Sequence, residues 1–172
     1  MLILFCRASR KLWNLFVATA TETFQNQYWI TPQTEEQDKS LKYHFKNVDN
    51  DCAGYFDGVM KFLNDYSDWK PIHSEYRFYH KVFLYAGTCD LLFETPKGIV
   101  LLDLKTTVQA HTNMWGVQLS AYRNGIENYC PSLKISATKV LQVSNDGNYI
   151  LHDIQENFSV FLACLQIKNF KE

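Results

Sequence analysis

The chain has 172 residues, of which 47% are hydrophobic and 15% aromatic, and its formal net charge is −1. The length and the apolar content exclude a disordered chain and predict a single domain, residues 1–172, with a buried core. The nearly neutral charge excludes a general attraction to nucleic acid, so any affinity of that kind must come from local patches.

The N-terminal part, residues 1–50, is predicted to be helical. Residues 9–29 place apolar side chains at helical spacing, residues 31–40 are polar and predict a loop, and a further helix runs to about Asn47. The apolar run at residues 1–6 is too short for a membrane span or a secretory segment, and no later segment approaches a span. We therefore expect no membrane partner. The five scattered cysteines, an odd number, are typical of a reducing compartment, so we expect an intracellular, cytoplasmic protein.

The rest of the chain alternates between helical and strand patterns. Runs of aromatic, β-branched and leucyl residues predict strands, and the Asn-Asp-Gly-Asn stretch at 145–148 predicts a hairpin turn. The predicted helices are 52–66, about 113–123 and 157–170, and the predicted strands are 71–80, 85–93, 98–106, 134–143 and 149–154. This order predicts an α/β fold with a mixed sheet of about five strands flanked by helices.

Charged residues stand at the ends of two apolar runs in the predicted hairpin. Asp103 and Lys105 are two apart on one strand, so their side chains project from the same side, and Asp90 lies on the adjacent strand. Two converging carboxylates repel each other unless a cation or a shared proton neutralises them, and a hard divalent cation is the simplest resident. Lys105 beside them could hold a phosphate or orient an attacking water.

The alternative is an ordinary solvated sheet edge with a weak surface ion pair. The apolar runs at 91–93 and 99–102 weigh against it, because they predict central strands with both faces covered. Charge is not expected in such strands unless it is paired or ligated. The context therefore favours a functional site over an ordinary solvated sheet edge.

Three short motifs follow one another here: G-T-x-D at 87–90, D-x-K-T-T at 103–107 and Q-L-x-x-Y at 118–122. Together with the apolar hairpin they resemble the PD-(D/E)xK nuclease superfamily, in particular its RecB-like branch, which includes phage and mitochondrial single-strand exonucleases. The resemblance covers residues 54 to 125. It implies a restriction-endonuclease-like core and a single nuclease domain, and it places the protein in the host cytoplasm if its source is viral.

The resemblance also implies roles for individual residues. Asp90 and Asp103 would bind Mg²⁺ or Mn²⁺ as catalytic metal ligands, together with the backbone carbonyl of Leu104, and Lys105 would be the catalytic lysine. Glu75 matches the glutamate that family members carry upstream of the G-x-x-D strand; the alternative is a solvent-facing strand residue. His44 is the best positional candidate for the family's upstream histidine, although the Gly-Thr pair that usually precedes it is missing; the alternative is a structural helix histidine.

Two further pairs of residues have alternative interpretations. Gln118 and Tyr122 are four apart, so on a helix they share one face and could reach the same site or a DNA backbone; alternatively the helix simply packs on the sheet with Gln118 at its margin. His73 and His80 flank Glu75, and either could bind metal or cap a strand.

The resemblance implies a metal-dependent DNA nuclease that hydrolyses phosphodiester bonds, an exonuclease acting on single strands or DNA ends in repair or recombination. The alternatives are a structure-specific endonuclease and a non-catalytic nucleic-acid-binding or assembly subunit that has kept the nuclease fold. The expected partners are DNA, further copies of the chain, and a replication or recombination protein. The five cysteines are scattered without a close C-terminal set, so we expect no iron–sulfur cluster.

Overall fold

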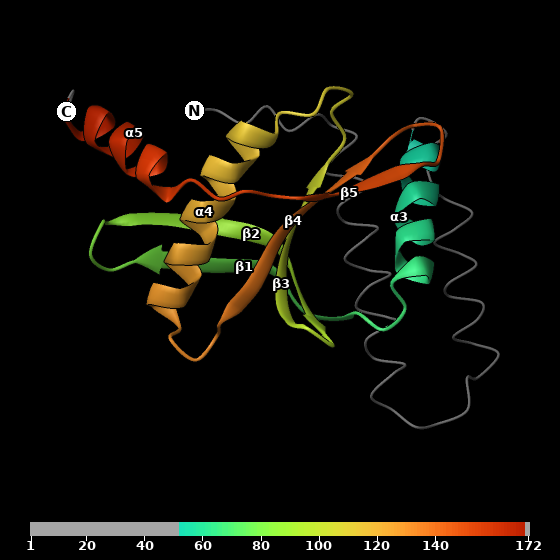
Figure 1. Ribbon diagram of the computed structural model, residues 1–172, viewed down its shortest axis with the longest axis horizontal. Coiled ribbons are helices and arrows are strands. Elements are labelled where there is room, and N and C mark those ends of the chain that lie inside the picture. The colour runs from blue at the N-terminus through green and yellow to red at the C-terminus, as the bar shows by residue number, and fades with distance from the viewer. Residues whose placement is uncertain (1–51, 171–172) are drawn as a thin grey trace. The chain divides into compact units, whose positions relative to one another are not determined.

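The computed structural model describes residues 52–170 (Figure 1). These residues divide into two compact units, 52–67 with 143–149 and 68–142 with 150–170. The described elements are α3 (Ala53–Asp65), β1 (Lys70–His80), β2 (Tyr85–Thr95), β3 (Gly98–Lys105), α4 (Thr112–Tyr129), β4 (Ile135–Val143), β5 (Tyr149–Asp153) and α5 (Phe158–Phe170). The expectations for residues 1–50 lie outside the described residues, and the expectation of a single domain stays a prediction.

In the first unit, α3 packs against the turn at 143–149. Gly54 leaves no room for a side chain, because a Cβ there would collide with the backbone of Asn145. The ring of Tyr149 meets Phe62 edge-on, with centroids 5.7 Å apart. A close backbone approach and one aromatic contact therefore hold this turn on the helix.

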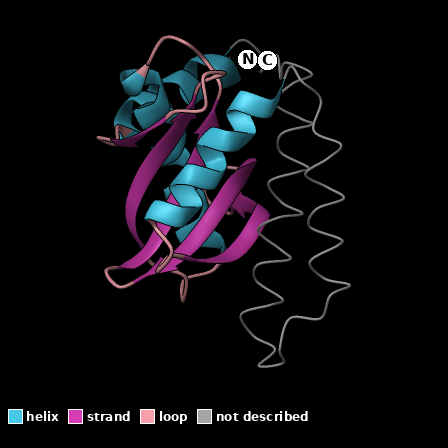
Figure 2. Ribbon diagram, turned by 90° about the vertical axis from the view of Figure 1, so that its right-hand side faces the viewer, coloured by secondary structure: helices cyan, strands magenta, loops and turns pink. Residues whose placement is uncertain are grey.

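The second unit is built on a sheet whose strand order is β1-β2-β3-β4-β5. β1 pairs with β2 and β2 with β3 in antiparallel fashion, whereas β3 and β4 are parallel. Figure 2 shows the strands as a twisted sheet. The predicted α/β fold, with a mixed five-stranded sheet and helices flanking it, is confirmed, as is the hairpin of β2 and β3.

β3 is the central strand, and four consecutive residues in it, 100–103, are buried. Leu101 and Leu102 have no exposed surface although they point to opposite faces. Both faces of β3 are therefore covered, as the apolar run predicted, and Asp103 continues a fully apolar segment.

α4 lies across β1, β2 and β3 (Figure 1) and buries Trp115 and Leu119. Phe78 of β1 anchors the helix, because its ring fills the space beside Gly125 of α4 and Gly87 of β2. A Cβ at either glycine would collide with this ring, so the helix can approach the sheet closely only where side chains are missing. Gln118 is half-buried at the margin of the packed face.

The turn between β1 and β2 is organised by His80. Its buried ring accepts hydrogen bonds at Nδ1 from the backbone N–H groups of Val82 and Phe83, each at 3.2 Å. Burial lowers the pKa of this imidazole, which favours the neutral ring that these bonds need. Of the two interpretations of His80, capping is therefore the one that the structure supports.

The C-terminal helix α5 begins one residue after its predicted start and ends at its predicted residue. No helix within residues 52–170 combines the length and the apolar character needed to cross a membrane.

Candidate functional site

The candidate site lies where β2 and β3 stop pairing. Leu91 and Leu102 are the last paired residues in this direction, and Asp90 and Asp103 follow directly on the two strands. Asp90 Oδ2 accepts a hydrogen bond of 2.9 Å from the backbone N–H of Leu104. The Asp90 carboxylate thus takes up a backbone donor at the point where the ladder ends.

Asp103 is buried, with 2% of its surface exposed. Its Oδ2 lies 2.6 Å from Lys105 Nζ, an ion pair between residues two apart on the same strand. The ammonium group of Lys105 is thus the partner of Oδ2, and the described residues give this oxygen no other donor. One cationic partner does not replace all the water that a buried carboxylate loses, so Asp103 can still accept from a further ligand.

Helix α4 adds two polar side chains to the site. Lys105 Nζ donates to Gln118 Oε1 at 3.4 Å, and Gln118 Nε2 donates to Tyr122 Oη at 2.8 Å. Since the amide oxygen faces the cation and the amide nitrogen faces the phenol, Gln118 links the lysine to the helix. Of the alternatives for this pair, the structure therefore brings Gln118 and Tyr122 into the same site as Lys105; contact with DNA stays a prediction.

Both carboxyl groups of the site have raised pKa values, so without a bound metal ion they hold their protons more tightly than an exposed aspartate does. Burial, and next the charge of Asp103, raise the pKa of Asp90 to about 7, against the hydrogen bond from Leu104. Burial also raises the pKa of Asp103, with Lys105 acting in the opposite direction. Burial raises the pKa of Tyr122 to about 12, so this phenol stays protonated at neutral pH. A pair of carboxylates in this condition gains from any cation that binds between them.

Glu75 lies on the neighbouring strand and has an unusual backbone. Its φ is +48°, in the left-handed region that costs free energy for a residue with a side chain. The pairs Ser74–Leu91 and Tyr76–Cys89 flank it, so it lies opposite Asp90, and its charge adds to the rise in the pKa of that carboxyl. The Glu75 residue itself is exposed. The structure thus places it beside the site, and its role as a ligand stays a prediction.

The described residues offer a cation two carboxylates. Among residues 52–170 there is no group of three or more His, Cys, Asp and Glu side chains arranged to hold a metal ion. Mg²⁺ is commonly bound by one or two carboxylates, with water and substrate phosphate completing its coordination. Asp90, which accepts from the Leu104 N–H, and Asp103, which pairs with Lys105, are two buried carboxylates of the kind that fit such an ion.

The roles of the other expected metal ligands stay predictions. His44 lies outside the described residues, and His73 packs beside the ring of Tyr76, with centroids 4.9 Å apart. Leu104 is placed between the two acidic residues by its N–H, and a role for its carbonyl is not tested. The absence of an iron–sulfur cluster is likewise a prediction.

The sequence patterns did not indicate one residue that lies close to the site. Gln142 is buried at the end of β4, directly beside Lys105 in the parallel register. Its Nε2 donates to the backbone carbonyls of Thr107 and Val108, at 2.6 and 3.2 Å. The available signal was a polar residue inside the apolar run 140–143.

No protein-family model matches the chain, and none of the curated proteins matches it either.

Proposed function

We propose that the chain is a Mg²⁺- or Mn²⁺-dependent deoxyribonuclease of the PD-(D/E)xK type, with a RecB-like site that acts as an exonuclease on single strands or DNA ends. The observation that carries the proposal is the buried Asp103–Lys105 pair at the end of the central strand, facing Asp90. An ordinary surface ion pair does not require burial. Phosphoryl transfer requires acidic metal ligands and a positive charge together in a site that excludes water.

Each residue then has a distinct task. Asp90 and Asp103 would hold the metal, which when bound supplies Lewis acidity at a phosphate oxygen and lowers the pKa of a water. Lys105, held by Gln118 at 3.4 Å, would place its positive charge beside the scissile phosphate and orient the attacking water. Tyr122 would keep Gln118 in the orientation that presents its oxygen to the lysine.

The test is incubation of the protein with end-labelled single-stranded and double-stranded DNA, with and without Mg²⁺ or Mn²⁺. We expect metal-dependent cleavage that Lys105→Ala abolishes. Lys139→Ala is the matched control, because Lys139 also pairs with an aspartate on the sheet and is exposed to nearly the same extent, 18% against 19%.

Two results would overturn the proposal. The first is no cleavage of any DNA by the wild-type chain with either metal. The second is an equal loss of cleavage in Lys105→Ala and Lys139→Ala, because the lysine of the site would then have no special role.

The end-directed activity is tested separately from the site. A closed circular DNA has no ends, so an exonuclease leaves it intact while it degrades the linear form. Cleavage of both forms at similar rates would replace the exonuclease with a structure-specific endonuclease using the same residues.

A second candidate is a non-catalytic nucleic-acid-binding or assembly subunit with a nuclease fold. The observation that favours it is the number of protein ligands, since the described residues contribute no third acidic or histidine side chain to a metal site. Binding of labelled DNA without cleavage in Mg²⁺ and Mn²⁺ would support this candidate.

A further inference from the structure

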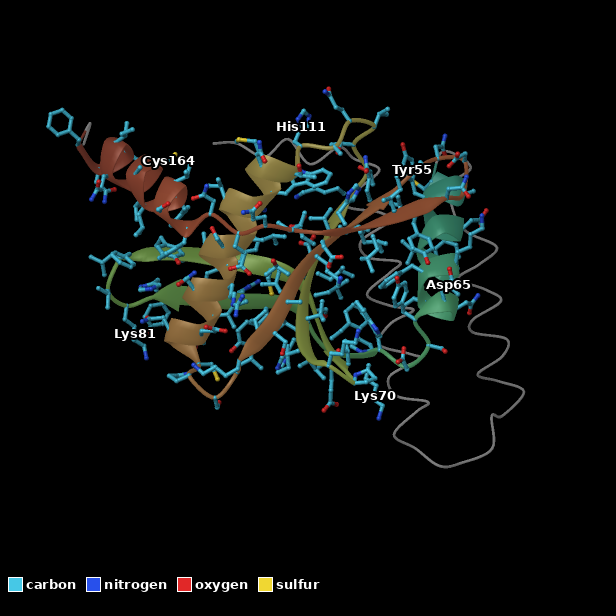
Figure 3. All side chains as sticks on the ribbon, in the orientation of Figure 1. Tyr55, Asp65, Lys70, Lys81, His111 and Cys164 are labelled. Carbon is cyan, nitrogen blue, oxygen red and sulfur yellow. The ribbon has the colours of Figure 1, made fainter. Side chains whose placement is uncertain are left out.

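The segment between β3 and α4 begins directly after Lys105 and is exposed over residues 107–114. Val108 has its whole surface exposed and Met114 has 58% of it exposed. In Figure 3 His111, the last residue before α4, lies at the edge of the molecule. Single exposed apolar side chains are normal at protein surfaces, so the exposure of Val108 shows that this segment is accessible and no more.

The backbone of this segment is nonetheless held in place. Gln142 Nε2 donates to the carbonyls of Thr107 and Val108, two groups that no strand ladder pairs. Gln142 Oε1, an amide carbonyl oxygen, accepts from His152 Nε2 at 2.8 Å. The His152 ring meets Trp115 of α4 edge-on at 5.4 Å. Buried polar contacts thus fix the base of a segment whose side chains face solvent.

The charge of this region is also unusual. Between Asp103 and Glu127 the sequence contains no aspartate or glutamate, although the chain has 18 acidic residues. The exposed side chains at 107–114 include Thr107, Gln109, His111 and Asn113, all of which can donate hydrogen bonds. Such groups contact phosphate oxygens in nucleic-acid complexes, and apolar side chains at the same surfaces contact sugars and bases.

We propose that residues 107–114 form a contact surface for the phosphate backbone of a nucleic-acid strand, held in position by Gln142. The inference rests on the proposed function and deepens it, because it assigns the strand a path from Lys105 along this segment. Fixing the backbone in advance removes the ordering cost that a mobile loop would bring to binding. The segment itself carries no carboxylate that would repel the phosphates.

The test compares two exposed valines. Val108→Glu puts a carboxylate on the proposed surface, and Val82→Glu puts one at the turn between β1 and β2, where the valine is 70% exposed. Figure 3 labels Lys81 at that turn and His111 at the start of α4, well apart in the same unit. Both variants change the net charge equally, so they differ only in place.

Binding of a fluorescent single-stranded oligonucleotide is measured by anisotropy in EDTA, which prevents metal-dependent cleavage. At about 50 mM salt we expect Val108→Glu to raise Kd roughly three- to tenfold and Val82→Glu to leave it unchanged, with the difference shrinking as salt rises. Gln109→Lys should lower Kd and steepen its salt dependence. Gln142→Met, which keeps the volume but loses the amide donors, should raise Kd.

Equal effects of the two valine variants, no effect of Val108→Glu, or no binding by the wild-type chain would overturn the inference. Its failure is separable from that of the proposed function. A wild-type chain that cleaves DNA while Val108→Glu binds normally sinks the inference alone, and a chain that binds through this surface but never cleaves sinks the nuclease proposal alone.

Discussion

Two lysine–aspartate pairs on the same sheet have nearly identical lysines and very different aspartates. The side chains of Lys105 and Lys139 are 19% and 18% exposed, whereas the side chains of their partners Asp103 and Asp153 are 3% and 86% exposed. An exposed aspartate loses little water when it pairs, so the Lys139–Asp153 pair contributes little to stability and needs no further partner. One lysine does not replace all the water that the buried Asp103 loses on folding. A bound cation would therefore stabilise the Lys105–Asp103 pair more than the Lys139–Asp153 pair.

The largest effect is expected on cleavage. Asp103→Asn removes the charge of a proposed metal ligand, and we expect the rate of DNA cleavage in Mg²⁺ to fall at least about a thousandfold. Asp153→Asn, the same change in the exposed pair, should leave the rate within about twofold, because surface pairs contribute little. The measurement is single-turnover cleavage of labelled DNA, and similar losses in both variants would erase the distinction between the two pairs.

Metal binding sharpens the comparison without any substrate. With Mg²⁺ at about a hundred times its Kd, the Tm of the wild-type chain should rise by about 5–10 °C, because the ion binds only the folded state. Asp90→Asn should abolish this rise and Asp153→Asn should keep it, as followed by thermal unfolding with and without EDTA. A rise that survives in Asp90→Asn would mean that the ion binds elsewhere.

The pH dependence of stability follows from the buried carboxyl. The pKa of Asp90 is about 7 in the folded chain against an ordinary 3.8, so the folded state binds its proton more tightly. In EDTA this group therefore stabilises the fold fully below about pH 3.8, and the contribution, roughly 4 kcal/mol, is lost as the pH rises through about 7.

The measurement is the free energy of unfolding by urea at pH 4, 5.5 and 7.5. Asp90→Asn should flatten the curve between these values, while Asp153→Asn should keep the wild-type slope. Parallel curves for the wild type and Asp90→Asn would show that the carboxyl titrates normally.

The smallest effect concerns the link from Lys105 to α4. Gln118→Met keeps the volume but loses the amide that accepts from Lys105 and donates to Tyr122. We expect kcat to fall about tenfold with KM nearly unchanged, since a hydrogen bond from a charged group contributes about 1.5 kcal/mol at the lower end of its range. If KM rises instead and kcat stays, Gln118 contacts the DNA and does not position the lysine.

The hairpin and its charged residues could be predicted because their signals are local. Apolar runs, a turn-like break and a two-residue spacing are enough to place Asp103 and Lys105 on one side of β3. The buried central position also follows from the uninterrupted apolar run at 99–102.

The remaining features depend on contacts between distant segments. Gln142 is 35 residues from Thr107, and only the parallel pairing of β3 with β4 brings them together. The left-handed backbone of Glu75 has no local signal either, since strand patterns predict extended residues at every position. Periodicity describes one element at a time, so it does not show which side chains a neighbouring strand supplies.

The ring of Phe78, lodged between Gly87 and Gly125, limits how the sequence can vary. Neither glycine carries a functional group, yet a methyl group at Gly125 would push α4 away from the sheet, and α4 holds the amide that Lys105 contacts. In a library of random variants selected for activity, these two positions should therefore tolerate as few substitutions as the acidic residues themselves. The pattern of tolerated substitutions would then identify the contact between α4 and the sheet as clearly as it identifies the acidic residues.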